Sequence, residues 1–162
     1  MQMSSNTAKQ GQAMGVNGHG PNDARRQYAT FYVGDMFFGV HVTEVQEVLR
    51  YQEMTQVPLA PAVIEGLINL RGQIVTALDM RRRLAVAPRD PERQPMNMVV
   101  RSEDGPVSLL VDEIGDVLEV PSDQFEPPPD NIANIQRHLL DGIYKLDGRL
   151  LLALNRARVL QT

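Results

Sequence analysis

The pattern of apolar and polar residues after the first 27 positions is that of short β-strands. Residues 28–33 (YATFYV) and 36–40 (MFFGV) are rich in aromatic and β-branched residues, and Gly34 and Asp35 separate them. Two such runs around a short turn segment predict a β-hairpin. Residues 1–26 have no such pattern and are rich in Gly, Asn, Gln and Ser. They bury too little apolar surface to offset their ordering entropy, which predicts a disordered N-terminal tail.

The pattern changes to a helical one after the hairpin. Val42, Val45 and Val48 recur every third residue, which is typical of one face of a helix. Residues 43–46 (TEVQ) have the form of a capping box, in which the Thr side chain accepts from the third amide and the Gln reaches back. The sequence therefore predicts a short helix over residues 42–49.

This helix-like segment occurs twice. Residues 42–49 (VTEVQEVL) match residues 111–118 (VDEIGDVL), which lie 69 positions later. In both copies a polar residue that suits a helix N-cap, Thr43 or Asp112, follows a predicted strand. Glu113 and Asp116 would then be exposed on the second helix.

A longer segment also recurs, without gaps. Residues 66–84 (GLINLRGQIVTALDMRRRL) align with residues 142–160 (GIYKLDGRLLLALNRARVL), 76 positions later. Each copy has two apolar runs around a glycine turn, and then Asp79 or Asn155 where the second strand would pass into a helix. Asp and Asn are preferred N-cap residues, so each copy predicts a hairpin and a terminal helix.

The repeats divide residues 27–160 into two similar halves, with the hand-over near residues 85–96. About five short strands in each half suit a small closed barrel better than a flat sheet, because closure removes exposed strand edges. The predicted fold class is mainly β, with two similar β-barrels packed together and a few short helices.

Arg71 stands out because the repeat supplies a comparison. The hairpin tip is Arg71-Gly72 in the first half and Asp147-Gly148 in the second. Asp-Gly is a preferred two-residue turn, so the fold does not require arginine. A surface ion pair would add only about 0–1 kcal/mol. Recognition of a partner's carboxylate or carbonyl groups is the sharper hypothesis, because a guanidinium offers several donors in a fixed fork. A tolerated residue in a three-residue loop is the alternative.

Composition excludes several kinds of site. The 162 residues include no cysteine, which excludes disulfides, thiolate metal sites and a Cys nucleophile. His19, His41 and His138 lack metal-ligand spacing, and the sequence has no phosphate loop or nucleophile–base pair, so we expect no metal, cofactor or catalysis. A net charge of −4, without an apolar membrane span or signal-peptide core, predicts a soluble, cytoplasmic protein that does not insert into membranes.

The basic segment 79–84 (DMRRRL), with Arg89 and Arg93, raises the alternative of a small β-barrel that binds nucleic acid. Aromatic residues, which would stack on bases, make up only 5% of the chain, and the arginines alternate with acidic residues. Arg82 has a counterpart in Arg158, which fits a repeated structural feature. A solvated helix face is therefore favoured, and no nucleic-acid partner is expected.

From about residue 28 to residue 160 the chain resembles the CheW-like domains of bacterial chemotaxis. The resemblance rests on the motifs VxEVxEV, TQVPLAP and IEGLINLRGQIVTALDMRRRL, and most specifically on NLRG at 69–72 followed by DMR at 79–81. It implies two five-stranded, SH3-like barrels without catalysis. Thr76 and Ala85 depart from a proline and a glycine that are usual in this family.

The resemblance implies a non-enzymatic adaptor, associated with membrane receptor clusters through protein contacts. It would join the cytoplasmic tips of chemoreceptors (methyl-accepting chemotaxis proteins) to the regulatory domain of the histidine kinase CheA. Arg71 would be the main receptor-binding residue, with Glu47 as its partner and Asn69 beside it. An apolar groove would hold the receptor helix. Its floor would be formed by Val42, Val45 and Val48, although for any single one of them an ordinary core position is favoured.

The resemblance also implies a kinase contact in residues 55–59 and around Gly66. The residues assigned to it are Thr55, Gln56, Val57, Leu59 and Gly66. Within the family, an adaptor of a parallel pathway that controls pili, surface behaviour or cyclic-dinucleotide signalling stays open as the alternative, because the sequence does not separate it from chemotaxis.

Overall fold

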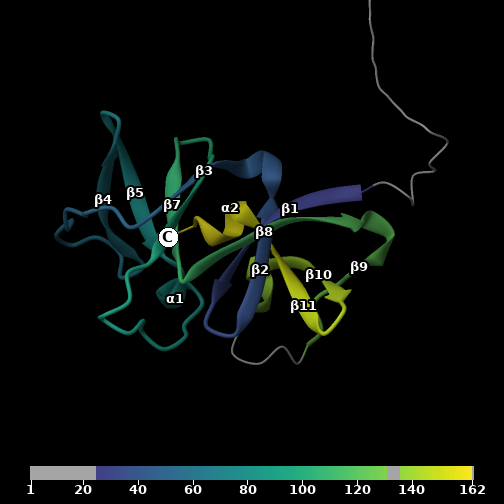
Figure 1. Ribbon diagram of the computed structural model, residues 1–162. Helices are drawn as coiled ribbons and strands as arrows, with labels where there is room; N and C mark the ends of the chain where they lie inside the picture. Colours follow the sequence, from purple (N-terminus) through teal and green to yellow (C-terminus); the bar gives the residue numbers. More distant parts are fainter. Residues whose placement is uncertain (1–24, 131–135, 162) are drawn as a thin grey trace, which may run out of the picture.

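The strands form two sheets that lie side by side (Figure 1). The computed structural model describes residues 25–130 and 136–161. The strands are β1 (Arg25–Val33), β2 (Met36–His41), β3 (Val45–Leu49), β4 (Ile64–Leu70), β5 (Gln73–Asp79), β6 (Met96–Val100), β7 (Val107–Val111), β8 (Glu113–Pro121), β9 (Phe125–Glu126), β10 (Leu140–Leu146) and β11 (Arg149–Leu154). The helices are α1 (Met80–Arg83) and α2 (Arg156–Val159), with the 3-10 turns η3 (Val42–Glu44), η4 (Ser122–Gln124) and η5 (Arg137–Leu139).

The two halves of the chain exchange strands. The five-stranded sheet, here called barrel A, has the order β3-β6-β7-β5-β4, and the six-stranded sheet, barrel B, has the order β8-β1-β2-β11-β10-β9. The hairpin β1–β2 thus pairs with strands of the second half, and the hairpin β6–β7 pairs with strands of the first. The mainly β fold with two such sheets confirms the predicted fold class, but neither barrel is built from one half alone.

The longer repeat forms the same unit twice. The hairpin β4–β5 is followed by α1, and the hairpin β10–β11 is followed by α2. The Asp79 carboxylate accepts a hydrogen bond from the Arg81 amide at 3.0 Å. The Asn155 side chain accepts one from the Arg158 amide, also at 3.0 Å. Both predicted N-caps are therefore confirmed.

The predicted helix over residues 42–49 is wrong. After the η3 turn the chain continues as β3, which pairs with β6. The valines have a helical spacing for two reasons. The interval from Val42 to Val45 spans a 3-10 turn, which has about three residues per turn. The interval from Val45 to Val48 contains a β-bulge, which adds one residue to the strand. Valine also favours strands, since its branched side chain packs well on a pleated surface.

The second copy of this segment is extended too. Residues 113–118 belong to β8, so Glu113 and Asp116 are exposed on a strand and not on a helix. Asp112 lies between β7 and β8 and caps no helix. Its carboxylate instead forms the ion pairs described in the next section.

Three apolar clusters hold the barrels together. One lies within barrel A around Ile68 and Val75, and another within barrel B around Tyr28 and Tyr144. The largest combines residues of both sheets, including Phe31, Phe38, Leu78, Met98 and Leu109. Buried apolar surface stabilises by about 25 cal/mol per Å², so this shared cluster makes the stability of each barrel depend on the other.

The N-terminal strand begins inside the predicted tail 1–26. Arg25 and Arg26 belong to β1 and pair with Pro121 and Val120 of β8. The prediction of disorder is wrong for these two residues, and residues 1–24 lie outside the described part of the chain.

Candidate functional site

Arg71 occupies the tip of the β4–β5 hairpin in a left-handed backbone conformation. Leu70 pairs with Gln73, so Arg71 and Gly72 form a two-residue loop, and the three-residue alternative is wrong. Their φ angles are 52° and 87°, as a type I′ turn requires. The Asn69 side chain closes the turn by accepting a hydrogen bond from the Gly72 amide at 2.9 Å. Left-handed helical backbone disfavours an L-residue by roughly 1–2 kcal/mol, so arginine is an unfavourable choice for this turn.

The repeated hairpin differs at the corresponding position. In the described part of the chain, the non-glycine residues with positive φ are Leu59, Arg71 and Ala85. Asp147 is not among them, although Gly148 has a φ of 80°. The two tips therefore agree in loop length but not in backbone conformation. Arg71 holds a conformation that its counterpart avoids, which supports a role for its side chain beyond the fold.

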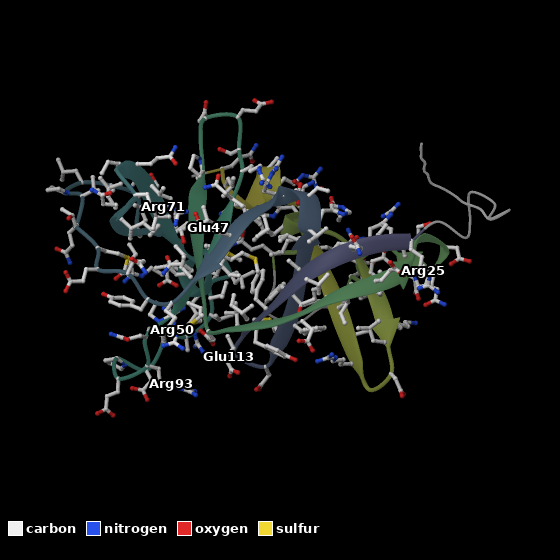
Figure 2. The ribbon with its side chains drawn as sticks, turned by 45° about the horizontal axis from the view of Figure 1, so that its top comes forward. Arg25, Glu47, Arg50, Arg71, Arg93 and Glu113 are labelled. Carbon is white, nitrogen blue, oxygen red and sulfur yellow. The ribbon has the colours of Figure 1, made fainter. Side chains whose placement is uncertain are left out.

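Glu47 of β3 forms an ion pair with Arg71, the pairing that the family resemblance implied (Figure 2). β3 and β4 are the edge strands of barrel A, so the pair connects two edges of one sheet. The Glu47 side chain is 20% exposed and the Arg71 side chain 71%. Within the described residues, the guanidinium has no second acceptor. Glu47 thus fixes one side of a guanidinium whose other donors face solvent.

The ion pair stabilises the charged forms of both groups. The hydrogen bond from Arg71 lowers the pKa of Glu47 below its ordinary value. The same hydrogen bond raises the pKa of Arg71. At neutral pH both groups are therefore charged and the ion pair is maintained.

The three valines assigned to a groove have different surroundings. Val48 is 45% exposed on β3, next to Glu47. Val45 packs against the shared cluster, so its contacts are those of a core residue. Val42 is half-buried in η3. Val48 is therefore the valine of this set that is most accessible to a partner.

Thr55 and Gly66, two of the residues assigned to the kinase contact, belong to one backbone contact. The Thr55 amide donates to the Leu67 carbonyl at 2.9 Å, and the Leu67 amide donates to the Thr55 carbonyl at 2.8 Å. A Cβ on Gly66 would lie 2.7 Å from the Thr55 oxygen, which is too close for any other residue. Gly66 therefore lets the segment before β4 approach this strand.

The other assigned kinase-contact residues form an exposed loop. Gln56, Val57 and Leu59 are all exposed, and Leu59 has a left-handed φ of 65°. The Leu59 side chain is fully exposed to solvent. Val57 and Leu59 are thus two large apolar side chains that this loop exposes to solvent.

Sequence reasoning missed the ion pairs of Asp112. Its carboxylate binds the guanidinium groups of Arg81 and Arg89. These partners are 31 and 23 residues away in the chain, so no local pattern could indicate them. Helix N-capping was a reasonable local interpretation for an aspartate after a strand, but the tertiary structure gives this residue a different role.

The basic segment 81–83 makes its contacts within the protein. Arg82 donates to the Ala62 carbonyl at 3.1 Å, and its counterpart Arg158 donates to the His138 carbonyl at the same 3.1 Å. Arg83 donates to the Val159 carbonyl at 2.8 Å. These paired contacts support the interpretation of Arg82 and Arg158 as a repeated structural feature.

Within residues 25–130 and 136–161, no group of three or more His, Cys, Asp or Glu side chains could hold a metal ion. The helices of this same part of the chain are all too short or too polar to cross a membrane.

Known proteins resemble this chain in sequence and in structure. The family model described as "CheW-like domain" matches residues 27–162. The probable chemotaxis protein CheW of Rhizobium etli is 32% identical over 130 residues, covering 80% of this chain and 84% of the relative. Chemotaxis protein CheW of Rhizobium meliloti is 32% identical over 126 residues, covering 78% and 81%. The crystal structure of the scaffolding protein TtCheW from Thermoanaerobacter tengcongensis matches with a TM-score of 0.74 at 26% identity, over 82% of this chain and 90% of that chain. The chain therefore belongs to the family of CheW-like domains, as its motifs predicted.

Proposed function

We propose that this protein is a non-enzymatic adaptor that joins the cytoplasmic tips of chemoreceptors to the regulatory domain of the histidine kinase CheA. Its family membership supports the adaptor role, since the relatives named above are chemotaxis proteins and a scaffolding protein. The observation that carries the proposal is the Arg71–Glu47 pair: an exposed guanidinium is held at a turn whose backbone conformation disfavours arginine.

The receptor contact would combine apolar burial with one charged interaction. An amphipathic receptor helix would cover Val48 on β3 and bring a carboxylate or a helix-end carbonyl to the free side of Arg71. Glu47 would keep the guanidinium in place, so that fewer side-chain rotamers are lost on binding. Asn69 would act indirectly, because its side chain closes the turn that carries Arg71.

The kinase contact would use the exposed loop that follows Thr55. Val57 and Leu59 supply its apolar side chains, and Gln56 lies beside them. The backbone contact between Thr55 and Leu67 would hold the base of this loop. The two partners would then bind different parts of barrel A, which is what an adaptor requires.

The receptor contact is tested by titrating purified chemoreceptor tips and CheA with the wild type and with Arg71→Asp. We expect the variant to lose receptor binding while retaining its circular dichroism spectrum and its CheA binding. The matched control is Asp147→Asn, at the tip of the repeated hairpin, which should bind as the wild type does. A folded Arg71→Asp protein with undiminished receptor affinity would contradict the proposed role of Arg71.

The kinase contact requires a separate variant. Leu59→Ser should weaken CheA binding and leave receptor binding unchanged, because Leu59 is exposed and removed from the Arg71 turn in sequence. Loss of both activities would show instead that the loop supports the whole barrel. If the wild type binds neither partner, the adaptor would belong to a parallel chemosensory pathway, and partners from that pathway should be titrated.

A further inference from the structure

The β-bulge in β3 determines which way Glu47 points. Val45 pairs with Val100 and Glu47 pairs with Val99, so Gln46 is an additional residue in this strand. Successive side chains in a regular strand point to opposite faces, and an added residue changes the direction of every side chain after it. The position of Glu47, and through it that of Arg71, therefore depends on the bulge.

Arg101 holds the backbone of the η3 turn that leads into this bulge. One guanidinium nitrogen, Nη1, donates to the Thr43 carbonyl at 2.9 Å and to the Val45 carbonyl at 2.7 Å. The Arg101 amide donates to the Glu44 carbonyl at 2.9 Å. Three consecutive carbonyl groups of the chain thus accept hydrogen bonds from one residue, immediately before the bulge.

Arg156 of α2 reaches the same turn from the other side. Its Nε lies 3.5 Å from Glu44 Oε2, and both side chains are largely buried. The second oxygen, Glu44 Oε1, is buried without a hydrogen-bond partner among the described residues. An incompletely satisfied pair of this kind is weak evidence for stability, so we consider its effect on the geometry of the turn. It connects the η3 turn of barrel A to the terminal helix that follows barrel B.

Barrel B provides a comparison, because its strand β8 has the same bulge where it pairs with β1, without the arginine. Ile114 pairs with Phe31 as Val45 pairs with Val100, so Tyr32 stands where Arg101 does. There the bulge contains Gly115, and the Thr30 hydroxyl donates to the Asp116 carbonyl beside it. The fold can therefore form this bulge by another means, and the arginine occurs in the barrel that carries Glu47 and Arg71.

We propose that Arg101 and Arg156 are positioning residues for the Arg71–Glu47 site. They hold the η3 turn and the bulge so that Glu47 meets the guanidinium of Arg71. The consequence for receptor binding rests on the proposed function, whereas the positioning itself concerns only this chain.

The experiment therefore has two readouts, one of which needs no partner. The pKa of the Glu47 carboxyl is measured by carbon-13 NMR titration, because its value reports the hydrogen bond from Arg71. In Arg101→Met this pKa should rise toward its ordinary value, and affinity for a purified receptor tip should fall about tenfold, equivalent to about 1.4 kcal/mol. Arg156→Met should shift both quantities in the same directions.

Two further variants make the test decisive. Arg101→Lys keeps the charge and can reach one carbonyl, so its Glu47 pKa and its receptor affinity should lie between those of the wild type and Arg101→Met. If Arg101→Met does not fold, Arg101→Lys replaces it in the test. Arg158→Met removes a similar guanidinium-to-carbonyl bond elsewhere and should leave the Glu47 pKa unchanged. An unchanged Glu47 pKa in folded Arg101 variants, or an equal shift in Arg158→Met, would overturn the positioning role. A shifted pKa in a protein whose wild type binds no receptor would instead count against the proposed function.

Discussion

Asp112 and Arg81 form a two-point ion pair that joins the two barrels. Arg81 Nε donates to Asp112 Oδ1 at 3.1 Å, and Nη2 donates to Oδ2 at 2.6 Å. Arg81 belongs to α1, which follows barrel A, and Asp112 lies where the chain crosses into β8 of barrel B. The same carboxylate accepts from the Gly34 amide at 2.7 Å, at the tip of the β1–β2 hairpin. One side chain therefore connects three parts of the fold.

Replacement of Asp112 by Asn should destabilise the protein by about 2–3 kcal/mol, because it leaves two largely buried guanidinium groups without their shared counterion. The free energy of unfolding is measured by urea denaturation. Asp147→Asn, at an exposed turn, is the control and should change it by less than about 0.5 kcal/mol. Equal stability of the two variants would show that Asp112 is dispensable for joining the barrels.

Acid should weaken this link only at low pH. Burial raises the pKa of Asp112, but the hydrogen bonds from Arg81 and the Gly34 amide outweigh burial and leave the pKa below its ordinary value. A carboxyl with a lowered folded-state pKa stabilises the protein above its unfolded pKa of about 4, and this contribution is lost as pH falls through the folded-state pKa. The free energy of unfolding should therefore fall more steeply below about pH 4 in the wild type than in Asp112→Asn. Parallel pH profiles from urea titrations would contradict this.

The backbone conformation of Arg71 predicts a gain in stability when arginine is removed. In a Glu47→Gln background, where the ion pair is already absent, Arg71→Asn should raise the free energy of unfolding by about 0.5–1 kcal/mol, because Asn adopts left-handed backbone more readily. Asp147→Asn in the same background should have a smaller effect, since Asp147 has no positive φ. A loss of stability in the first variant would mean that the Arg71 side chain has a structural contact of its own.

The positive φ of Ala85 predicts a change in stability at a residue to which no partner contact is assigned. Ala85 has a φ of 59° just beyond Leu84, the residue that caps the end of α1, and the Val86 amide there donates to the Arg81 carbonyl at 2.9 Å. Glycine suits this helix-ending position, so Ala85→Gly should raise the free energy of unfolding by about 1 kcal/mol and the melting temperature by about 2–4 °C. The matched control is Ala157→Gly inside α2, which should lower stability by about 0.5–1 kcal/mol.

Gly66→Ala should destabilise barrel A by about 1–3 kcal/mol, because the added methyl group would meet the Thr55 carbonyl oxygen at 2.7 Å. Amide hydrogen exchange at Thr55 and Leu67 should become faster, since these two residues lose their mutual hydrogen bonds. Normal exchange at both amides, together with weaker CheA binding, would favour direct contact of Gly66 with the kinase over this backbone role.

The local sequence determined much of this protein. Hairpins, turns and N-caps depend on residues close together in the chain, so Gly34-Asp35, Asp79 and Asn155 were assigned correctly. The repeat predicted two similar β units, and the NLRG and DMR motifs identified the family. The resemblance to that family implied Glu47 as the partner of Arg71. It could not indicate that Arg71 has left-handed backbone, because the loop of the same length at Asp147 does not have it at that residue.

Only the tertiary structure decided how the halves combine. The sequence repeat would be the same whether or not the two units exchange hairpins. Which strands pair depends on the burial of apolar residues that are distant in sequence, so the repeat alone does not determine it. The shared apolar cluster supplies that burial. Likewise, Val42, Val45 and Val48 have a helical spacing because the segment contains a 3-10 turn and a bulge. Its pairing with β6 makes residues 45–49 a strand and not a helix. The ion pairs of Asp112 and the hydrogen bonds of Arg101 join residues distant in sequence, so they exist only once both barrels have formed.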